Sequence, residues 1–310
     1  MRTHRLAAVA STFVTAGLLI ATADAQRGPA TPPLIREGVT EKVSDHVHVI
    51  PDASVQMVPN VGIIVGSRAT LVIDTGLGAR NGQAIMREVG KVSRNTELYL
   101  ATTHFHPEHD LGAQGFPAHT TMLRSRDQQS DVDELGAETL KRFSSMSAFN
   151  AELLQGAEYR KADVHFDAEH TLDLGGVRVR LIAMGANHTR GDTAFFVEPD
   201  RILFSGDVVM TALPGFGTPQ ARIATWLRSQ ERFEQLRPAR IVPSHGPMGD
   251  AAMMANYRRF LTTVQTRAAA LKAEGKTADQ AVQLLQEELQ SQYDRNRMVG
   301  AIRAAYNEAP

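Results

Sequence analysis

The segment TTHFHPEHDLGAQGF, residues 102–116, places three histidines and a glutamate within the six positions from His104 to His109. The residues just before it, in TELYLATTHFH, are rich in strand-forming types. We therefore expect the histidine cluster to begin where a strand ends. Histidine is uncommon in protein cores and gathers where its ring nitrogens bind something. The pattern therefore favours a fold that delivers further ligands to this strand end over a fold in which the histidines only pack.

Three later segments have the same layout, an apolar strand with a candidate ligand directly after it. AMGANHTRGDT supplies His188, ILFSGDVV supplies Asp207 and RIVPSHGP supplies His245. Taken singly, each could be an ordinary turn residue, but loops at strand ends are where folds gather functional side chains. The candidates form one nitrogen set and one mixed set: His104, His106 and His188, then Glu108 or His109 with Asp207 and His245. Nitrogen and oxygen ligands without sulfur suit zinc, iron or manganese.

The order of predicted elements indicates an α/β fold with two sheets. HVHVIP, VGIIVG and ATLVIDTG read as strands, and ARNGQAIMREVGKVS has helical spacing. A mainly helical stretch at about 127–157 is followed by further strands, by the helix ARIATWLRSQERFEQLR and by the strand ARIVPSHG. Helices then continue to the end. This order predicts two mixed sheets packed face to face with helices outside.

With these segments in place, the chain resembles the metallo-β-lactamase superfamily over roughly residues 40–250. The resemblance is carried by IDTG around Asp74, THFHPEH, NHTRGD, FSGD and PSHG, in the family order. It implies an αββα sandwich that holds one or two metal ions at the sheet edges. By the same resemblance, His104, His106 and His188 hold the first ion, His109 and His245 hold the second, Asp207 bridges them, and Asp74 lies beneath and orients ligands.

One position departs from the family pattern, which is His-x-His-x-Asp-His. Here the carboxylate is Glu108, whose extra methylene carries its oxygen ~1.5 Å further. Ligand distances tolerate only about 0.2 Å, so backbone or metal must shift to compensate. Three outcomes stay open: Glu108 ligates in an adjusted geometry, it holds only a water as a base, or it leaves the second site weak.

The two ends of the chain are expected to lie outside the sheets. MRTHR, LAAVASTFVTAGLLIA and ADA form the basic, apolar and small-residue parts of a signal peptide, residues 1–25, cut after Ala25. The apolar stretch is short for a membrane anchor, so we expect a periplasmic or secreted protein. Residues 26–38 read as a Pro-rich linker, residues 39–250 as the metallo-β-lactamase-like domain, and residues 251–310 as helices packed on that domain.

Composition narrows the chemistry further. The chain has no cysteine, which removes disulfides, thiolate nucleophiles and cysteine metal ligands. Its formal net charge of −1 gives no reason to expect nucleic-acid binding or, after signal cleavage, an electrostatic membrane contact. The expected partner is a small-molecule substrate.

These expectations combine into a metal-dependent hydrolase. A metal-bound hydroxide, oriented by Asp207 or Glu108, attacks an acyl carbon of an ester, thioester, lactone or lactam. We expect one or two zinc ions, with iron or manganese as alternatives. β-Lactamase activity, iron-dependent sulfur or oxygen chemistry, and a non-catalytic ligand-binding domain remain alternative functions. Met57 in a predicted flap and Phe216 in the loop after Asp207 are candidate substrate contacts. The helical stretch at 127–157 either covers the sheet or forms a lid over a pocket.

Overall fold

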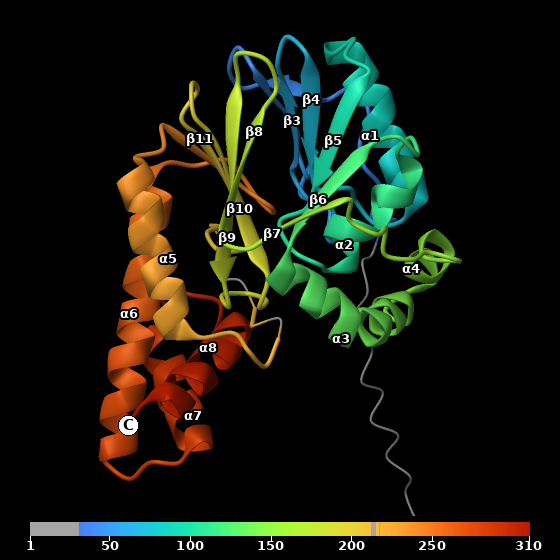
Figure 1. Cartoon of the computed structure of the whole chain (residues 1–310). Helices are drawn as coiled ribbons and strands as arrows, with labels where there is room; N and C mark the ends of the chain where they lie inside the picture. Colours follow the sequence, from blue (N-terminus) through green and yellow to red (C-terminus); the bar gives the residue numbers. More distant parts are fainter. Residues whose placement is uncertain (1–30, 212–214, 217) are drawn as a thin grey trace, which may run out of the picture.

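The computed structural model describes residues 31–211, 215–216 and 218–310. Over this part of the chain, two mixed β-sheets pack face to face between layers of helices, which confirms the predicted αββα sandwich (Figure 1). The predicted signal peptide, residues 1–25, lies outside the described residues, as does the first part of the predicted linker.

The first sheet has seven strands in sequence order: β1 (Glu41–Lys42), β2 (Val47–Ile50), β3 (Val61–Val65), β4 (Ala69–Ile73), β5 (Glu97–Ala101), β6 (Thr121–Ser125) and β7 (Val164–Phe166). Strands β1 to β4 pair antiparallel, and β4 to β7 pair parallel. Parallel neighbours need crossover connections. These are α1 (Ala79–Val92), then α2 (Pro107–Asp110) with the 3₁₀ helix η1 (Leu111–Gly115), then α3 (Arg126–Ser144) with α4 (Ala148–Leu153).

The second sheet has five strands in the order β12-β11-β10-β9-β8. They are β8 (Glu169–Asp173), β9 (Arg178–Gly185), β10 (Asp192–Val197), β11 (Ile202–Gly206) and β12 (Arg240–Pro243). The pair β11 and β12 is parallel and is connected through α5 (Ile223–Leu236), whereas the other neighbours are antiparallel.

Alternating side chains from both sheets fill the space between them. Leu71 and Ile73 of β4 point into this space and share one buried cluster with Phe195 and Phe204 of the second sheet. Gly62 of β3 makes room for the ring of Phe204, because a Cβ there would lie 2.6 Å from Cε1 of that ring. The two inner faces therefore pack with complementary shapes as well as burying apolar surface.

The outer faces are covered by different helices. Helix α1 buries Ile85 and Val89 against the first sheet. Helix α5 lies on the second sheet with α6 (Ala251–Ala273), α7 (Ala278–Leu289) and α8 (Arg295–Glu308), as the orange and red part of Figure 1 shows. Trp226, Phe260 and Ile302 belong to one buried cluster with residues of β9, β10 and β11, so residues 251–310 share a core with the sandwich.

The chain before the first strand is held on α1. Asn81 accepts a hydrogen bond from the backbone of Ile35 at 2.8 Å and donates one to the carbonyl of Pro33 at 2.9 Å. The C-terminal part of the predicted linker is therefore docked on the domain.

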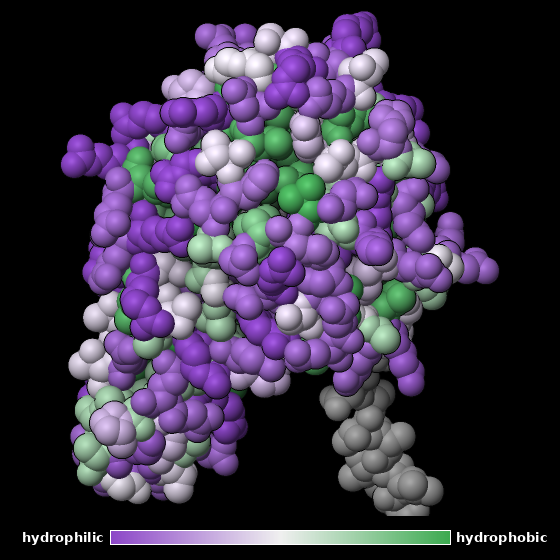
Figure 2. All heavy atoms as spheres, viewed as in Figure 1, coloured by the Kyte–Doolittle hydropathy of each residue, from purple (hydrophilic) through white to green (hydrophobic). Residues whose placement is uncertain are grey.

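Two further features describe the surface. Figure 2 shows a mostly hydrophilic face, on which apolar side chains appear only in small areas. Within the described residues, no helix combines the length and apolar character needed to cross a bilayer.

Candidate metal centre

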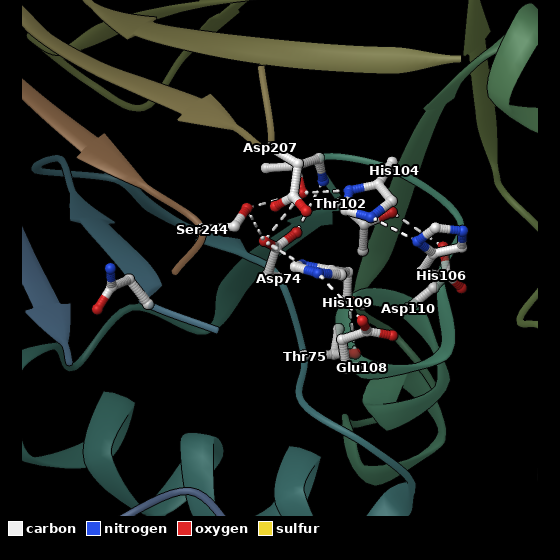
Figure 3. Close-up of polar contacts among 12 residues, drawn as sticks. Asp74, Thr75, Thr102, His104, His106, Glu108, His109, Asp110, Asp207 and Ser244 are labelled. Atoms are coloured by element: carbon white, nitrogen blue, oxygen red, sulfur yellow. Dashed lines mark hydrogen bonds and ion pairs between the residues drawn. The ribbon is translucent and has the colours of Figure 1, made fainter. Parts of the chain in front are cut away.

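The candidate ligands predicted from the sequence meet at one edge of the sandwich, where strands of both sheets end. Figure 3 labels His104, His106, Glu108, His109 and Asp207 among them. His104 and His106 follow β5, and Glu108 and His109 lie on the short helix α2 that comes next. The second sheet contributes His188 between β9 and β10, Asp207 after β11 and His245 after β12. Residues 141 positions apart in the sequence, His104 and His245, thus belong to one cluster.

The first group consists of His104, His106 and His188, all buried. The Nε2 atoms of His104 and His188 each lie 3.1 Å from Nδ1 of His106, so three ring nitrogens face a common point. Burial, followed by the neighbouring imidazoles, holds the pKa of His104 and of His106 well below the usual value. Both rings are therefore neutral and keep a lone pair for a cation.

A second group consists of Glu108, His109 and His245, and a third of His104, His109 and Asp207. In each group the potential ligand atoms lie within 4.8 Å of one another. Asp207 is also 3.6 Å from Nε2 of His188. Its carboxylate therefore lies between the first group and the side of the cluster formed by His109, the position that the sequence resemblance implied for a bridging ligand.

Hydrogen bonds at Nδ1 fix the ring orientation of several histidines. His109 donates to Oδ2 of Asp74 at 2.9 Å, His245 donates to the carbonyl of Val58 at 2.9 Å, and His188 donates to the carbonyl of Gly215. When such a ring is neutral, its proton is on Nδ1 and its Nε2 atom carries the lone pair. This arrangement prepares histidine for metal binding, because the partner sets the tautomer and increases the basicity of the ligating nitrogen.

Asp74, predicted as an orienting residue, lies beside His109 in Figure 3. Besides His109, its carboxylate accepts bonds from the backbone N of Thr103 at 2.7 Å and from Oγ1 of Thr103 at 3.0 Å. Burial favours the neutral ring of His109, but the charge and hydrogen bond of Asp74, together with the charges of Glu108 and Asp207, outweigh it and raise the pKa of His109 to about 9. A proton or a cation on His109 Nε2 therefore compensates the buried negative charge.

Unpartnered buried atoms show that a cation fits. Glu108 Oε2, His109 Nε2 and Asp207 Oδ1 are all buried and have no hydrogen-bond partner among the described residues. Leaving such groups unpaired in a protein interior costs ~1–3 kcal/mol each. A divalent cation between carboxylates and imidazoles would satisfy all three, and the sulfur-free donor set suits zinc, manganese or iron.

The geometry also bears on the glutamate that replaces the family aspartate. Glu108 lies on α2, with Oε1 3.9 Å from Nε2 of His109, and it groups with His109 and His245. Burial raises the pKa of its carboxyl group. The longer side chain of Glu108 thus places a carboxylate oxygen close to the ring nitrogens of His109 and His245. This favours the outcome in which Glu108 ligates in an adjusted geometry.

A supporting layer of buried carboxylates was missed by the sequence analysis. Asp192 accepts bonds from the backbone N of His188 at 2.6 Å and of Thr189 at 3.1 Å, and burial raises its pKa to about 7. Asp131 of α3 accepts from the backbone N of Gly191 at 2.9 Å. Both brace the loop that carries His188. Asp192 stands within the quoted NHTRGD segment, whereas Asp131 carries no local signal because its partner is 60 residues away.

A second missed brace lies under α2. Asp110 follows His109 and pairs with Arg124 of β6 at 2.9 Å, with both side chains at most 1% exposed. Asp110 also accepts a bond from Thr102 at 2.9 Å. The loop bearing His104, His106 and Glu108 is therefore fastened at both of its ends.

A cavity of about 650 Å³ opens over the cluster and is lined by Glu108, Asp207, His245 and Met57 among others. Met57, predicted as a flap residue, thus reaches the cavity. Phe216 does not belong to its lining; its ring lies 5.2 Å from that of Trp226. From the helical stretch at 127–157, Phe143 packs beside His106 at 5.7 Å and no residue lines the cavity, which favours the cover over the lid.

Comparison with known proteins agrees with this geometry. The family model described as "Metallo-beta-lactamase superfamily" matches residues 56–245. A metallo-beta-lactamase from Pontibacter korlensis aligns with a TM-score of 0.56 at 19% identity, over 72% of this chain and 98% of that one. A stereoselective inverting sec-alkylsulfatase from Pseudomonas sp. aligns with a TM-score of 0.67 at 13% identity, over 86% of this chain and 49% of that one.

A curated relative is also found by sequence. An acyl-coenzyme A thioesterase of Homo sapiens is 26% identical over 191 residues, which is 57% of this chain and 67% of that protein. The aligned part is shorter than the described structure, and helices α6 to α8 lie beyond the end of the family match at residue 245.

Proposed function

Because this chain belongs to the metallo-beta-lactamase superfamily and is a metal-dependent hydrolase, we propose that it hydrolyses an acyl bond of a small molecule, with zinc as its metal. The bond is an ester, thioester, lactone or lactam. The proposal includes the location: the signal peptide expected at residues 1–25 would bring the enzyme to the periplasm or outside the cell.

The observation that carries this proposal is the position of the cluster at the base of an open cavity. Glu108, Asp207 and His245 belong both to the ligand groups and to the lining of the cavity of about 650 Å³. This volume suits a small substrate, because ligand pockets usually measure ~300–1,000 Å³. A reacting bond in the cavity would therefore lie against the metal ligands.

The protein's residues have separable tasks in such a reaction. His104, His106, His188, His109, His245, Asp207 and Glu108 would hold one or two ions. A divalent ion bound there would supply Lewis acidity and would lower the pKa of water to about 7. Asp207 Oδ1 and Glu108 Oε2, which lack partners among the described residues, can accept hydrogen bonds from a water that enters the cavity and so orient its oxygen.

One comparison supports an acyl substrate. The chain has no cysteine, which excludes a thiolate nucleophile and is compatible with attack by a metal-activated water. The curated relative, at 26% identity, is named an acyl-coenzyme A thioesterase, which makes a thioester a rational first substrate to test.

The test uses the mature protein, starting at Gln26. Elemental analysis of the purified protein identifies the metal and its stoichiometry, and a panel of one ester, one thioester, one lactone and nitrocefin reports the bond that is cleaved. We expect zinc and turnover of at least one acyl compound. His106→Ala should abolish turnover, whereas His119→Ala, at an exposed position, should not change it. A folded, zinc-loaded protein that hydrolyses none of the four compounds would contradict the proposal.

A further inference from the structure

The loop that carries His245 is held by one earlier segment, residues 52–60, which lies between β2 and β3. The ring of His245 donates from Nδ1 to the carbonyl of Val58 at 2.9 Å. Next to it in the sequence, the carbonyl of Ser244 accepts a hydrogen bond from the backbone N of Asn60 at 2.6 Å. Segment 52–60 therefore contacts both the ring and the adjoining backbone of this candidate ligand.

The side chain of Asn60 makes three further hydrogen bonds in the same place. Its Nδ2 donates to the carbonyls of Pro243 and Gly246, each at 2.8 Å, and its Oδ1 accepts from the backbone N of Asp52 at 2.8 Å. Asn60 is only 4% exposed, so breaking these bonds would leave polar groups unpaired in the interior. The asparagine thus fixes the backbone on both sides of His245.

The carboxylate of Asp52 connects this ligand loop to the wall of the substrate cavity. Its Oδ2 accepts a hydrogen bond from the backbone N of Gly246 at 2.7 Å, and its Oδ1 accepts one from the backbone N of Ser54 at 3.1 Å. Residues Ser54 to Met57, here called the flap, line the cavity of about 650 Å³ together with Asp52 itself. One carboxylate therefore bonds to the flap and to the loop of His245.

The backbone of the flap adopts a conformation that needs such support. Ala53 and Ser54 have φ angles of 50° and 57° and form a turn closed by a bond from Val55 N to the carbonyl of Asp52 at 2.9 Å. Met57 has a φ of 62°. Residues other than glycine seldom occupy this left-handed region, and they stay there where surrounding contacts determine the conformation. The bonds made by Asp52 supply such contacts.

We propose that Asp52 and Asn60 are positioning residues that couple the flap to the second ligand group, so that His245 reaches its ion only while the flap is held against the ligand loop. The inference goes beyond the proposed function, because it requires a metal ion at the cluster but no particular bond to be cleaved. Such coupling is reciprocal. An ion bound by His245 therefore also holds the flap, and a substrate that moves the flap changes the affinity for that ion.

Two substitutions with opposite charge changes test the positioning role. Asn60→Asp keeps the acceptor Oδ1 but loses both donated bonds and adds a negative charge, whereas Asp52→Asn removes a charge and can keep only one of its two accepted bonds. In a zinc titration, both should weaken binding of the second ion about ten- to hundredfold. The ion held by His104, His106 and His188 should be bound as in the unchanged protein.

The opposite charges separate positioning from electrostatics. An added negative charge by itself strengthens cation binding, and the loss of one weakens it. If the two variants shift the affinity for the second ion in opposite directions, or if neither shifts it, the proposal is wrong. The visible absorption of cobalt(II) at this site, which depends on the coordination number, should change in both variants. Asn60→Ser replaces Asn60→Asp if circular dichroism shows that the latter does not fold.

A matched control is Asn81→Asp. Asn81 is 1% exposed and has the same bonding pattern as Asn60: it accepts from the backbone N of Ile35 and donates to the carbonyls of Pro33 and Leu77. It belongs to none of the ligand groups and does not line the cavity. Asn81→Asp should therefore destabilise the fold to a similar extent but bind both ions. Equal loss of the second ion in Asn81→Asp and Asn60→Asp would overturn the positioning role.

Hydrogen exchange of the flap tests the coupling from the other side. Mass spectrometry of the peptide that contains residues 54–57 should show exchange slowing at least about fivefold when a second equivalent of zinc is added to protein with one equivalent. In Asn60→Asp this slowing should disappear. Flap exchange that does not respond to the second ion would refute the coupling.

Neither measurement uses turnover, so the two proposals can fail separately. A protein that hydrolyses none of the acyl compounds but shows zinc-dependent flap exchange would keep this inference and end the proposed function. A protein that cleaves an acyl compound with a flap indifferent to zinc would do the reverse.

Discussion

Replacing Asp74 by asparagine tests whether the buried carboxylate prepares His109 for metal. Asp74 accepts hydrogen bonds from Thr103 N at 2.7 Å, Thr103 Oγ1 at 3.0 Å and His109 Nδ1 at 2.9 Å. An amide has one acceptor oxygen, so in either orientation its NH₂ group faces Thr103 or His109. Asparagine tolerates the positive φ of 68° at this position as aspartate does, so the backbone should not change.

The expected magnitude follows from the tautomer of His109. With the NH₂ group beside Nδ1, the proton moves to Nε2, the atom that faces the second ligand group. A metal ion can then bind Nε2 only if the ring proton returns to Nδ1, where the amide NH₂ group cannot accept it. Loss of such an orienting partner weakens metal binding ~10- to 100-fold, which corresponds to about 1.4–2.8 kcal/mol. The ion held by His104, His106 and His188 should be affected less, because Asp74 does not contact those rings.

The assay is a zinc titration against a chromogenic chelator, followed by elemental analysis after dialysis at fixed free zinc. Asp74→Asn should retain one ion under conditions in which the unchanged protein retains two. Asp200→Asn is the matched control, because Asp200 forms another short histidine–aspartate pair, with the part-buried His46 at 2.9 Å, away from the ligand groups. Equal zinc affinity of Asp74→Asn and the unchanged protein at both sites would refute the reasoning.

Three further predictions concern stability and the neighbouring loop. In metal-free protein, folding raises the pKa of His109 from 6.5 to about 9. The protonated ring therefore contributes to the free energy of unfolding, and this contribution is fully present below pH 6.5. That contribution, up to about 3 kcal/mol, is lost as pH rises through 9. Thermal unfolding across this range should show a smaller loss in Asp74→Asn than in the unchanged protein, because only the charges of Glu108 and Asp207 then raise the pKa of His109. Gly62→Ala places a Cβ 2.6 Å from the Phe204 ring, so urea unfolding should show a loss of ~1–3 kcal/mol, partly recovered by adding Phe204→Leu. Asp131→Asn weakens the 2.9 Å hydrogen bond from Gly191 N. Zinc held by the His188 group should then dissociate about tenfold more readily in the chelator assay. An unchanged rate of zinc release would show that Asp131 does not stabilise the loop that carries His188.

The sandwich could be predicted because its signals are local. Apolar strands such as VGIIVG and ATLVIDTG became β3 and β4, and the helical spacing of ARNGQAIMREVGKVS became α1. Strands β1 and β7 were missed because two and three residues are too few to show a clear alternation. Strand β6 was missed because its sequence, TMLRS, contains one β-branched residue and an arginine, although four of its five residues are buried. Pairing with a neighbouring strand, which the sequence does not display, decides whether such short segments become part of a sheet.

The candidate ligands were predictable for a different reason. Each stands directly after an apolar strand, and strand ends of a sandwich meet at its edges. The residues that stabilise the ligand loops have no such sequence signal. Arg124 is a single arginine in TMLRS, and Asp131 is one of several acidic residues in a polar helical stretch. Their roles depend on contacts with Asp110 and Gly191 that exist only after folding. Phe216 was predicted from proximity to Asp207 in sequence, but its ring packs near Trp226, so its predicted substrate contact stays a prediction.

The candidate metal ligands and part of the cavity wall come from different parts of this chain. The ligands lie at strand ends within the matched segment, where the geometry of two sheets restricts variation. The cavity wall also includes Arg297 of α8. Helices α6 and α8 pack on the outer face of the second sheet, in one buried cluster that includes Trp226 and Phe260. A substitution on the cavity-facing side of α8 can therefore change the cavity wall without moving a ligand. It follows that the family motifs report the chemistry of the site, whereas the substrate must be inferred from residues that those motifs do not include.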